Sequence, residues 1–372
     1  MNILITGASG FVGRNLKAHL ETKDSLNIFE VVKETKLDRI ESLLSQADFI
    51  VHLAGSNRPK ADEEFQLVNT DLTKTICELA EKSGRCIPII FSSSTQVKIN
   101  NPYGRSKLQA EDYLHKYSTK TESPVYIFRL PNVIGKWCRP NYNSVVATFC
   151  HNISHGLPIE IHDPDVEMTL VYIDDIIRDF INIIMQTPES AGSGVTFCSV
   201  IPEYTITVGN LAEKIQKFKE SRKSLLTERV GNGLDRALYA TYLSYLDVAD
   251  FTYPLVQHED PRGTFVEILK THDSGQISYL TTKPGVTRGM HYHHTKSEKF
   301  LVVKGDAVFR YKKLYSDEVI EIMSSDRKPT VIETIPGWVH DITNTGVEDL
   351  IVLVWANEVF SNQAPDTIMS DF

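Results

Sequence analysis

The hydrophobic positions in the first 130 residues fall into short apolar runs separated by longer segments of helical period. Five runs have the length that is typical of strands buried on both faces of a sheet: residues 2–6, 28–32, 49–53, 87–91 and 125–128. Residues 11–20, between the first two runs, have the period of a helix. Buried strands that alternate with helices predict a doubly wound parallel α/β sheet.

The pattern changes further along the chain. Residues 205–246 keep a helical period, and packing of a helix is a sufficient explanation of their apolar stripe. Turn-forming residues and a proline follow in residues 247–257, and a strand-like pattern takes over in residues 258–372. We therefore predict an α/β domain over residues 1–246, a linker, and an all-β domain.

Composition excludes several classes of function. The 372 residues suit two or three domains, and the net charge of −9, from 39 basic and 48 acidic residues, gives a nucleic-acid or anionic-membrane partner no electrostatic support. The five cysteines are scattered without a CxxC pair, which argues against a disulfide framework and for a reducing compartment. No apolar run approaches the roughly 20 residues that span a bilayer, and the first run lacks preceding basic residues. We expect a soluble cytoplasmic protein.

A glycine-rich turn follows the first predicted strand. Gly7, Gly10 and Gly13 stand at GxxGxxG spacing before the predicted helix. Glycine permits a tight turn and close backbone approach, which leaves the N–H groups of the helix free to hold a pyrophosphate. A plain strand–turn–helix is the alternative, but the position at the start of an alternating pattern favours a dinucleotide site.

The pair Tyr103 and Lys107 is a candidate proton donor. On a helix, residues four apart share one face. A phenol with a pKa of about 10 is a poor acid at neutral pH, and a neighbouring ammonium favours its ionised form. Hydride transfer to a ketone needs such a donor, and a serine among residues 92–94, after the fourth apolar run, could hold the carbonyl. Chance spacing on a surface helix and a polar strand end are the alternatives.

These residues belong to a longer series of motifs. The series consists of residues 6–13, 52–55, 91–94, 129–132 and 171–175 with Asn69, Tyr103 and Lys107. It resembles the extended short-chain dehydrogenase/reductases that act on nucleotide sugars, which implies a Rossmann-type fold over roughly the first 245 residues. The resemblance implies that Ser94 and Tyr103 polarise and protonate the carbonyl while Lys107 also holds the nicotinamide ribose.

The same resemblance implies where the ligands bind. The implied cofactor-binding residues are Gly7, Gly10, Phe11, Val12, Gly13, Leu53, Ala54, Tyr103 and Lys107. Asn132 and residues 143–163 would shape the sugar-nucleotide pocket. The spacing from Ser94 to Tyr103 is shorter than is usual in the family, so the identity of the serine stays open.

The second apolar run ends without a clear carboxylate for a ribose 2′-hydroxyl. Lys33 stands there instead, and its charge suits a 2′-phosphate. We therefore expect NADPH rather than NADH as the cofactor. A solvated surface lysine is the alternative.

The C-terminal region holds a cluster of potential metal ligands. His291 and His293 would point to the same side of a strand, and Glu298 and His340 follow. Imidazole nitrogens and a carboxylate oxygen suit Zn or another divalent first-row metal. Surface histidines in a polar hairpin are the alternative.

The spacing around the cluster adds a second resemblance. Gly285, His291, His293, Glu298 and Gly305 stand at the spacing of the first cupin motif, and residues 336–344 resemble the second, except that the proline adjoins the glycine. The resemblance implies a small antiparallel β-barrel over residues 258–372, with His291, His293, Glu298 and His340 as metal ligands.

Residues 260–265 and 287–291 are similar to the sugar-nucleotide epimerase cupins of deoxysugar pathways. This similarity implies a substrate-binding role for Arg288. Those relatives often lack a metal and use histidine as a base. We favour a ligand role for His291, and the general base stays unassigned.

The order of the two regions, and the run at residues 136–145, resemble the bifunctional capsular-polysaccharide enzymes of the UDP-N-acetyl-L-fucosamine pathway. The resemblance implies 3-epimerisation of a UDP-2-acetamido-2,6-dideoxy-4-hexulose by the cupin and NADPH-dependent 4-reduction to UDP-2-acetamido-2,6-dideoxy-L-talose, for capsular or O-antigen polysaccharide, in a homodimer. One alternative is a monofunctional reductase with a structural cupin. A nucleotide-sensing regulator is the other, and the intact Tyr103–Lys107 pair argues against it.

Overall fold

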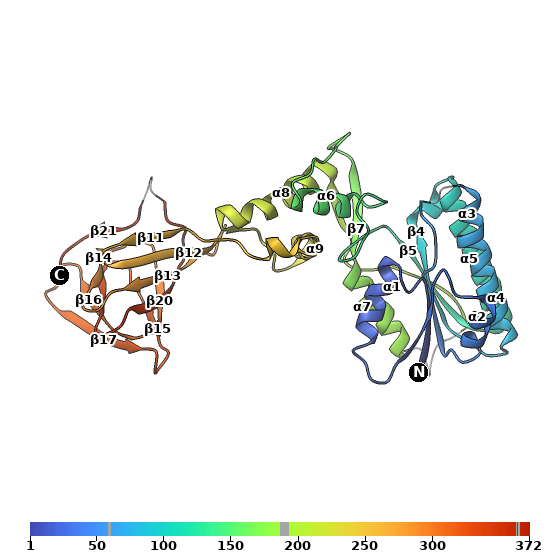
Figure 1. Ribbon diagram of the computed structural model, residues 1–372, viewed down its shortest axis with the longest axis horizontal. Helices are drawn as coiled ribbons and strands as arrows, with labels where there is room; N and C mark the ends of the chain where they lie inside the picture. The colour runs from blue at the N-terminus through green and yellow to red at the C-terminus, as the bar shows by residue number, and fades with distance from the viewer. Residues whose placement is uncertain (59–60, 187–192, 362, 364) are drawn as a thin grey trace. The chain divides into compact units, whose positions relative to one another are not determined.

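The computed structural model describes residues 1–58, 61–186, 193–361, 363 and 365–372 (Figure 1). The chain divides into two compact units. The first comprises Met1–Ile215 and Arg236–Asp247, and the second comprises Gln216–Asp235 and Val248–Phe372. The domain limits expected from the sequence remain a prediction.

A six-stranded parallel sheet in the order β2-β1-β3-β4-β5-β8 forms the centre of the first unit. Its strands are β1 (Asn2–Thr6), β2 (Asn27–Val31), β3 (Phe49–His52), β4 (Ile89–Ser94), β5 (Pro124–Leu130) and β8 (Gly194–Cys198). The predicted parallel α/β sheet is confirmed. Because the strand order reverses at β1, the carboxyl ends of β1 and β3 lie beside a crevice.

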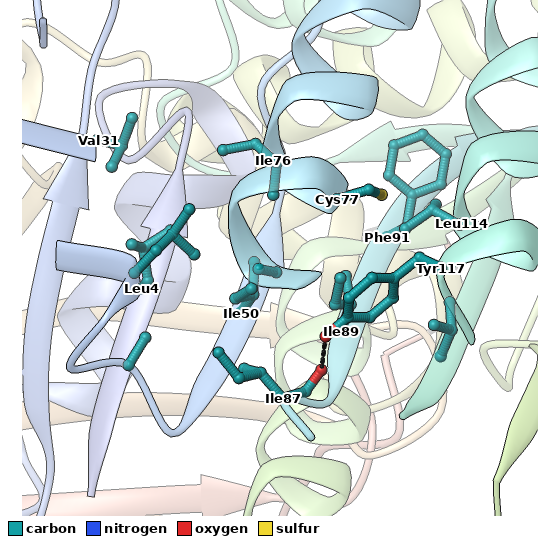
Figure 2. Packing of buried hydrophobic residues seen from close by; sticks show 14 of the residues in the cluster. Leu4, Val31, Ile50, Ile76, Cys77, Ile87, Ile89, Phe91, Leu114 and Tyr117 are labelled. Atoms are coloured by element: carbon teal, nitrogen blue, oxygen red, sulfur yellow. Dashed lines mark hydrogen bonds between the residues drawn. The ribbon is translucent and has the colours of Figure 1, made fainter. Parts of the chain in front are cut away.

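Helices cover both faces of this sheet (Figure 1). They are α1 (Phe11–Leu20), α2 (Leu37–Leu44), α3 (Glu63–Phe65), the π-helix η1 (Gln66–Asp71), α4 (Leu72–Lys82), the 3₁₀-helix η2 (Thr95–Lys98), α5 (Pro102–Thr121) and α7 (Ile173–Gln186). Helices α1 and α7 pack together on one face, and α2, α4 and α5 cover the other. Figure 2 shows the core under α4 and α5, where Phe91, Leu114 and Tyr117 pack together.

Helix α5 carries the Tyr103–Lys107 pair, and local sequence fixes its start. The side chain of Asn101 accepts a hydrogen bond from the Gly104 N–H at 2.7 Å, and Pro102 occupies the first turn, where a missing N–H costs nothing. The helix ends at Thr121, and the next residue, Glu122, has a left-handed φ of 57°. The two expected residues therefore lie on one helix, as predicted.

A smaller three-stranded sheet in the order β6-β7-β9 completes the first unit. Its elements are β6 (Asn132–Ile134), α6 (Val145–Ser154), β7 (Glu167–Tyr172), β9 (Tyr204–Thr207) and α9 (Gly233–Leu243). The expectation of a helical pattern throughout residues 205–246 is wrong. Helix α8 (Val208–Ser224) stops where Leu225 takes a φ of 61°, and the short strand β10 (Leu226–Thr227) follows before α9.

The second unit is rich in strands, as predicted. One sheet has the order β10-β12-β13-β20-β15-β18 with β11 paired to β12, and the other has the order β17-β16-β19-β14-β21. The strands are β11 (Gln257–Asp260), β12 (Gly263–Thr271), β13 (Gln276–Thr282), β14 (Thr287–Tyr292), β15 (Glu298–Lys304), β16 (Asp306–Lys313), β17 (Val319–Ser325), β18 (Val331–Glu333), β19 (Trp338–Asn344), β20 (Leu350–Ala356) and β21 (Ile368–Met369). A short 3₁₀-helix, η3 (Val248–Phe251), precedes them.

The core of this unit lies between the two sheets. Phe300 of β15 meets Phe309 of β16 edge to face, with ring centroids 5.6 Å apart, and Leu280 and Ile342 belong to the same cluster. Among the described residues, no strand pairing joins the two sheets into a closed barrel. The barrel therefore stays a prediction.

Leu114 on α5 is fully buried, whereas Leu108 on the same helix is 43% exposed. We expect Leu114→Ala to lower the free energy of unfolding by about 2–5 kcal/mol, because it removes apolar contacts and leaves a cavity against the sheet. Leu108→Ala should change it by less than about 0.5 kcal/mol. Denaturant unfolding measures both. Equal effects of the two changes would contradict this account of the core.

Candidate functional sites

The glycine-rich turn brings β1, β3 and α1 into backbone contact. A Cβ at Gly7, whose φ is 68°, would lie 2.8 Å from the Ala54 nitrogen, and a Cβ at Gly13 would lie 2.3 Å from the Gly7 oxygen. Only glycine fits these two positions without a shift of backbone. Helix α1 begins after Gly10 without a hydrogen bond from a capping side chain. The first N–H groups of the helix can therefore face an anion.

A cavity of about 650 Å³ in the first unit lies between this turn and α5. Its lining includes ten of the residues expected to bind or react: Gly7, Gly10, Phe11, Val12, Gly13, Leu53, Ser94, Tyr103, Lys107 and Asn132. Ala54 is not among the lining residues, and its N–H donates to the Thr6 hydroxyl at 3.2 Å. Lys33 lies two residues beyond β2 and is exposed outside the cavity wall.

The structure distinguishes between the three candidate serines at the end of β4. Ser92 Oγ lies 3.5 Å from the His52 carbonyl oxygen, and Ser93 donates to a carboxylate oxygen of Glu111 at 2.5 Å. Ser94 instead makes a hydrogen bond with the phenol of Tyr103. The geometry therefore favours Ser94, the serine expected from the family motif.

The expected lowering of the Tyr103 pKa is wrong for this arrangement. Burial raises the pKa of Tyr103 above its usual value of 10, and the hydrogen bond from Ser94 offsets only part of that rise. Lys107 does not face the phenol directly; its ammonium donates to the Ser92 carbonyl at 2.9 Å and lies 4.8 Å from the centre of the Phe91 ring. Tyr103 therefore stays protonated at neutral pH and can act as a donor.

Burial also lowers the pKa of Lys107, to about 8, while the nearby charge of Glu111 acts in the opposite direction. Glu111 follows Lys107 by one helical turn on α5 and was missed in the sequence. Its buried carboxylate is held by the Arg129 guanidinium in two contacts, of 3.1 and 2.6 Å. Glu111 follows Lys107 by four residues, as Lys107 follows Tyr103, so the same helical spacing could have identified it in the sequence.

Asn69 holds the loop that faces Lys107. Its side chain accepts from the Ser56 N–H at 2.8 Å and donates to the Ser56 carbonyl at 2.9 Å. A Cβ at Gly55 would lie 3.1 Å both from the Asn69 side-chain oxygen and from the Lys107 nitrogen. The π-helix η1 therefore contributes to the wall around the ammonium.

The opposite wall of the cavity comes from the segment before α6. Its lining residues are Trp137, Cys138, Arg139, Tyr142, Asn143 and Ser144. The stretch 143–163 was expected to shape a sugar-nucleotide pocket, and only its first two residues line the cavity. The side chain of Asn132 donates to the Thr169 carbonyl at 3.1 Å.

In the second unit the four expected metal ligands come together. His291, His293, Glu298 and His340 each offer a ligand atom within 4.8 Å of the others. His291 belongs to β14, whereas His293 stands just beyond its end, and the ring centroids lie 5.0 Å apart. Burial lowers the pKa of His291 to about 4, so this ring is neutral at neutral pH.

The hydrogen bonds around the cluster fit a cation. His340 Nδ1 lies 3.2 Å from the Trp338 carbonyl oxygen, and His293 Nδ1 contacts the Asp366 carbonyl oxygen. Both Nδ1 atoms therefore carry a proton, and both Nε2 atoms turn toward Glu298, at 3.7 and 3.3 Å from Oε2. The buried Nε2 of His340 has no hydrogen-bond partner among the described residues. A divalent metal would satisfy these acceptors.

Two adjoining cavities, of about 320 and 480 Å³, open over this cluster. Arg288, Arg262 and Lys296 line both of them. Arg262 and Arg288 contact Asp260, and Lys296 Nζ lies 2.9 Å from Glu298 Oε1. Glu298 also lines both cavities, and Glu259, Asp260 and Glu267 line the larger one, so the walls carry charges of both signs. The buried Nε of Arg288 has no hydrogen-bond partner among the described residues, which leaves this guanidinium able to bind an anionic substrate, as its expected role requires.

The chain belongs to the NAD dependent epimerase/dehydratase family, whose model matches residues 3–197. The model of the polysaccharide biosynthesis C-terminal domain matches residues 258–368. Among curated proteins, the chain is 51% identical to the UDP-2-acetamido-2,6-beta-L-arabino-hexul-4-ose reductase of Pseudomonas aeruginosa. That match covers 99% of this chain and 98% of the relative.

Solved structures extend the comparison. The capsular polysaccharide assembling protein CapF from Staphylococcus aureus is 45% identical, with a TM-score of 0.92 over the whole of both chains. The UDP-glucuronic acid 4-epimerase from Bacillus cereus, in complex with UDP-glucuronic acid and NAD, is 18% identical, with a TM-score of 0.56 over 66% of this chain and 99% of that one. This second likeness concerns the fold alone. Across the part of the chain that is described, no helix is both long and apolar enough to cross a membrane.

The buried Lys107 predicts a pH dependence. Since the pKa of Lys107 is about 8 and only its charged form pairs with an anionic oxygen, we expect kcat/KM for NADPH to be constant below pH 8 and to fall about tenfold per unit above it. Tyr103, with its raised pKa, should add no second decline below pH 10. Steady-state NADPH oxidation between pH 6 and 9.5 measures this. A flat profile over that range would contradict the assignment of Lys107.

Proposed function

We propose that the chain is a bifunctional nucleotide-sugar enzyme. In this proposal the second unit is a cupin that 3-epimerises a UDP-2-acetamido-2,6-dideoxy-4-hexulose, and the first unit reduces C4 with NADPH to give UDP-2-acetamido-2,6-dideoxy-L-talose. One observation carries the reductase: Ser94, Tyr103 and Lys107 line the same cavity as the glycine-rich turn. The name of the 51% identical relative, a UDP-hexulose reductase, supports the same substrate class.

In the reductase the residues of the chain supply the proton and the orientation. The cofactor, when bound, supplies the hydride. The Tyr103 phenol donates its proton to the C4 oxygen, and the Ser94 hydroxyl, already within hydrogen-bonding reach of that phenol, polarises the same oxygen. The Lys107 ammonium lines the same cavity, where its charge would favour the phenolate left behind and would hold the nicotinamide ribose.

In the cupin the substrate has an acidic proton, because a C4 ketone stabilises the carbanion formed at C3. Removal of that proton and its return to the opposite face invert the centre. His291, His293, Glu298 and His340 would hold a Zn or another divalent first-row ion, which supplies stabilisation of the enolate oxygen when bound. Arg288 and Arg262 would hold the diphosphate of the substrate. The general base stays unassigned.

The alternative is a monofunctional UDP-keto-sugar reductase whose cupin serves dimerisation, with a structural metal. The name of the Pseudomonas relative, which mentions only reduction, is compatible with it. The bifunctional proposal is favoured because His291 and Glu298 line both cavities of substrate size and His340 lines the smaller one, with Arg262 and Arg288 in both walls. A structural metal has no need of such an opening.

Lys33 gives a prediction about the cofactor. Its exposed side chain follows β2, near the expected position of a ribose 2′-phosphate. We expect the protein to use NADPH far better than NADH, and Lys33→Ala to raise KM for NADPH about tenfold with little effect on NADH. Lys36→Ala, which removes another exposed lysine of the same loop, is the control. Comparable kcat/KM for NADPH and NADH in the unmodified protein would contradict the NADPH assignment.

The two activities can be separated in the full-length chain. Tyr103→Phe removes the proton donor, so we expect reduction to fall about 10²–10⁴-fold. Deuterium from solvent should still enter at C3 of the UDP-4-keto-sugar, as followed by NMR. Exchange should disappear in the double variant Tyr103→Phe with His340→Ala.

The matched control combines Tyr103→Phe with His294→Ala, because His294 is exposed and lies outside the ligand set. It should keep the exchange. The Tyr103→Phe protein could fail to introduce deuterium at C3 of a substrate that the unmodified protein reduces. That result would leave the proposed reductase activity standing and would assign the cupin a structural role. Loss of exchange in the His294 control as well would point to a folding defect.

A further inference from the structure

Residues 365–372, called here the C-terminal strap, lie against the strand and the turn that carry the metal-ligand candidates. Met369 and Ile368 of β21 pair with His291 and Tyr292 of β14. The N–H of Ser370 donates to the Met290 carbonyl at 3.0 Å. The strap therefore forms the outer edge of the sheet at the point where β14 ends.

A single carboxylate joins the strap to the turn after β14. Asp366 accepts hydrogen bonds from three successive backbone N–H groups, those of His294 at 2.9 Å, Thr295 at 2.7 Å and Lys296 at 2.8 Å. The Thr295 hydroxyl adds a fourth, at 3.0 Å. Hydrogen bonds to an ionised acceptor are stronger than those between neutral groups. This turn connects His293 to Glu298, so its conformation sets the distance between two of the four ligands.

The main chain of the same residue fixes a ligand ring directly. The Asp366 carbonyl accepts from Nδ1 of the buried His293. That contact holds the proton on Nδ1 and leaves the Nε2 lone pair facing Glu298 Oε2 at 3.3 Å. Partners of this kind orient a metal-binding imidazole and raise its basicity.

The end of the strap reaches the surroundings of a further ligand. The Phe372 ring lies 4.7 Å from the guanidinium carbon of Arg310. Arg310 holds the buried carboxylate of Asp341, the residue after His340, with a contact of 3.0 Å from its Nε to Oδ1. The strap therefore contacts groups that position His291, His293 and His340.

We propose that Asp366 is a positioning residue for the metal centre, and that the strap is the element that sets the metal affinity of the cupin. The inference rests on the metal site of the proposed function. Asp366 is not itself a ligand of the metal or the substrate. It affects the metal site through its contacts with the His293 ring and with the turn at residues 294–296. Loss of its carboxylate detaches the strap from the turn, so the Asp366 carbonyl is no longer held on the His293 ring and the ring can rotate away from Glu298.

The test compares metal binding in three full-length proteins: unmodified, Asp366→Ala and Asp371→Ala. Asp371 is an exposed carboxylate of the same strap and provides the matched control. Each protein is stripped with a chelator and titrated with Zn²⁺ in competition with a chromophoric indicator, and the bound metal is counted by mass spectrometry. We expect Asp366→Ala to weaken Zn²⁺ binding about 10–100-fold, the usual effect of removing a residue that supports a ligand, and Asp371→Ala to leave it unchanged.

Two further measurements separate positioning from folding. NADPH oxidation by the first unit, assayed with the 3-epimerised UDP-4-keto-sugar, and the circular dichroism spectrum should be unchanged in Asp366→Ala. Asp366→Asn should recover part of the Zn²⁺ affinity because one acceptor oxygen remains. Equal Zn²⁺ affinity in the unmodified and Asp366→Ala proteins would overturn the inference and leave the proposed metal site standing. Absence of stoichiometric Zn²⁺ in the unmodified protein would overturn both. An equal loss of Zn²⁺ affinity in Asp371→Ala would show that the effect depends on net charge alone, and would overturn the role of Asp366.

Discussion

A charged group that is buried away from water is destabilised unless an opposite charge or hydrogen bonds stabilise it. This constraint applies to both candidate sites. In the first unit the buried Lys107 ammonium donates to the Ser92 carbonyl, and the charge of Glu111 favours its ionised form. Glu111 is itself held by Arg129. In the second unit Glu298 is surrounded by Lys296 and the histidines.

The two units meet this constraint with different backbone geometry. Helix α5 places Tyr103, Lys107 and Glu111 at intervals of one turn, so a donor, a cation and a carboxylate follow each other along one face. The second unit instead relies on the end of a strand and the turn after it. A bulge between Gly289 and His291 and a Met290 φ of 62° turn the end of β14 so that the rings of His291 and His340 come within 4.7 Å.

Local patterns predicted much of this arrangement. The limits of β1 and α1 agree with the apolar periodicity, and the resemblance of residues 285–305 to the first cupin motif implied that the side chains of His291, His293 and Glu298 would meet. What failed depends on burial and on distant contacts. The pKa of Tyr103 rises because the phenol is enclosed, and no spacing along a helix reports enclosure. Asp366 could not be found because 73 residues separate it from the histidine it orients.

The distance of Asp366 from its turn along the chain has a consequence for biosynthesis. Strand β14 and the residues up to His340 leave the ribosome well before residue 366, and during that interval the His293 ring lacks the carbonyl that fixes its tautomer. The sheet edge along β14 is also uncovered until β21 arrives. The ligand geometry is therefore acquired late, when the strap docks, after all four ligand residues have been synthesised.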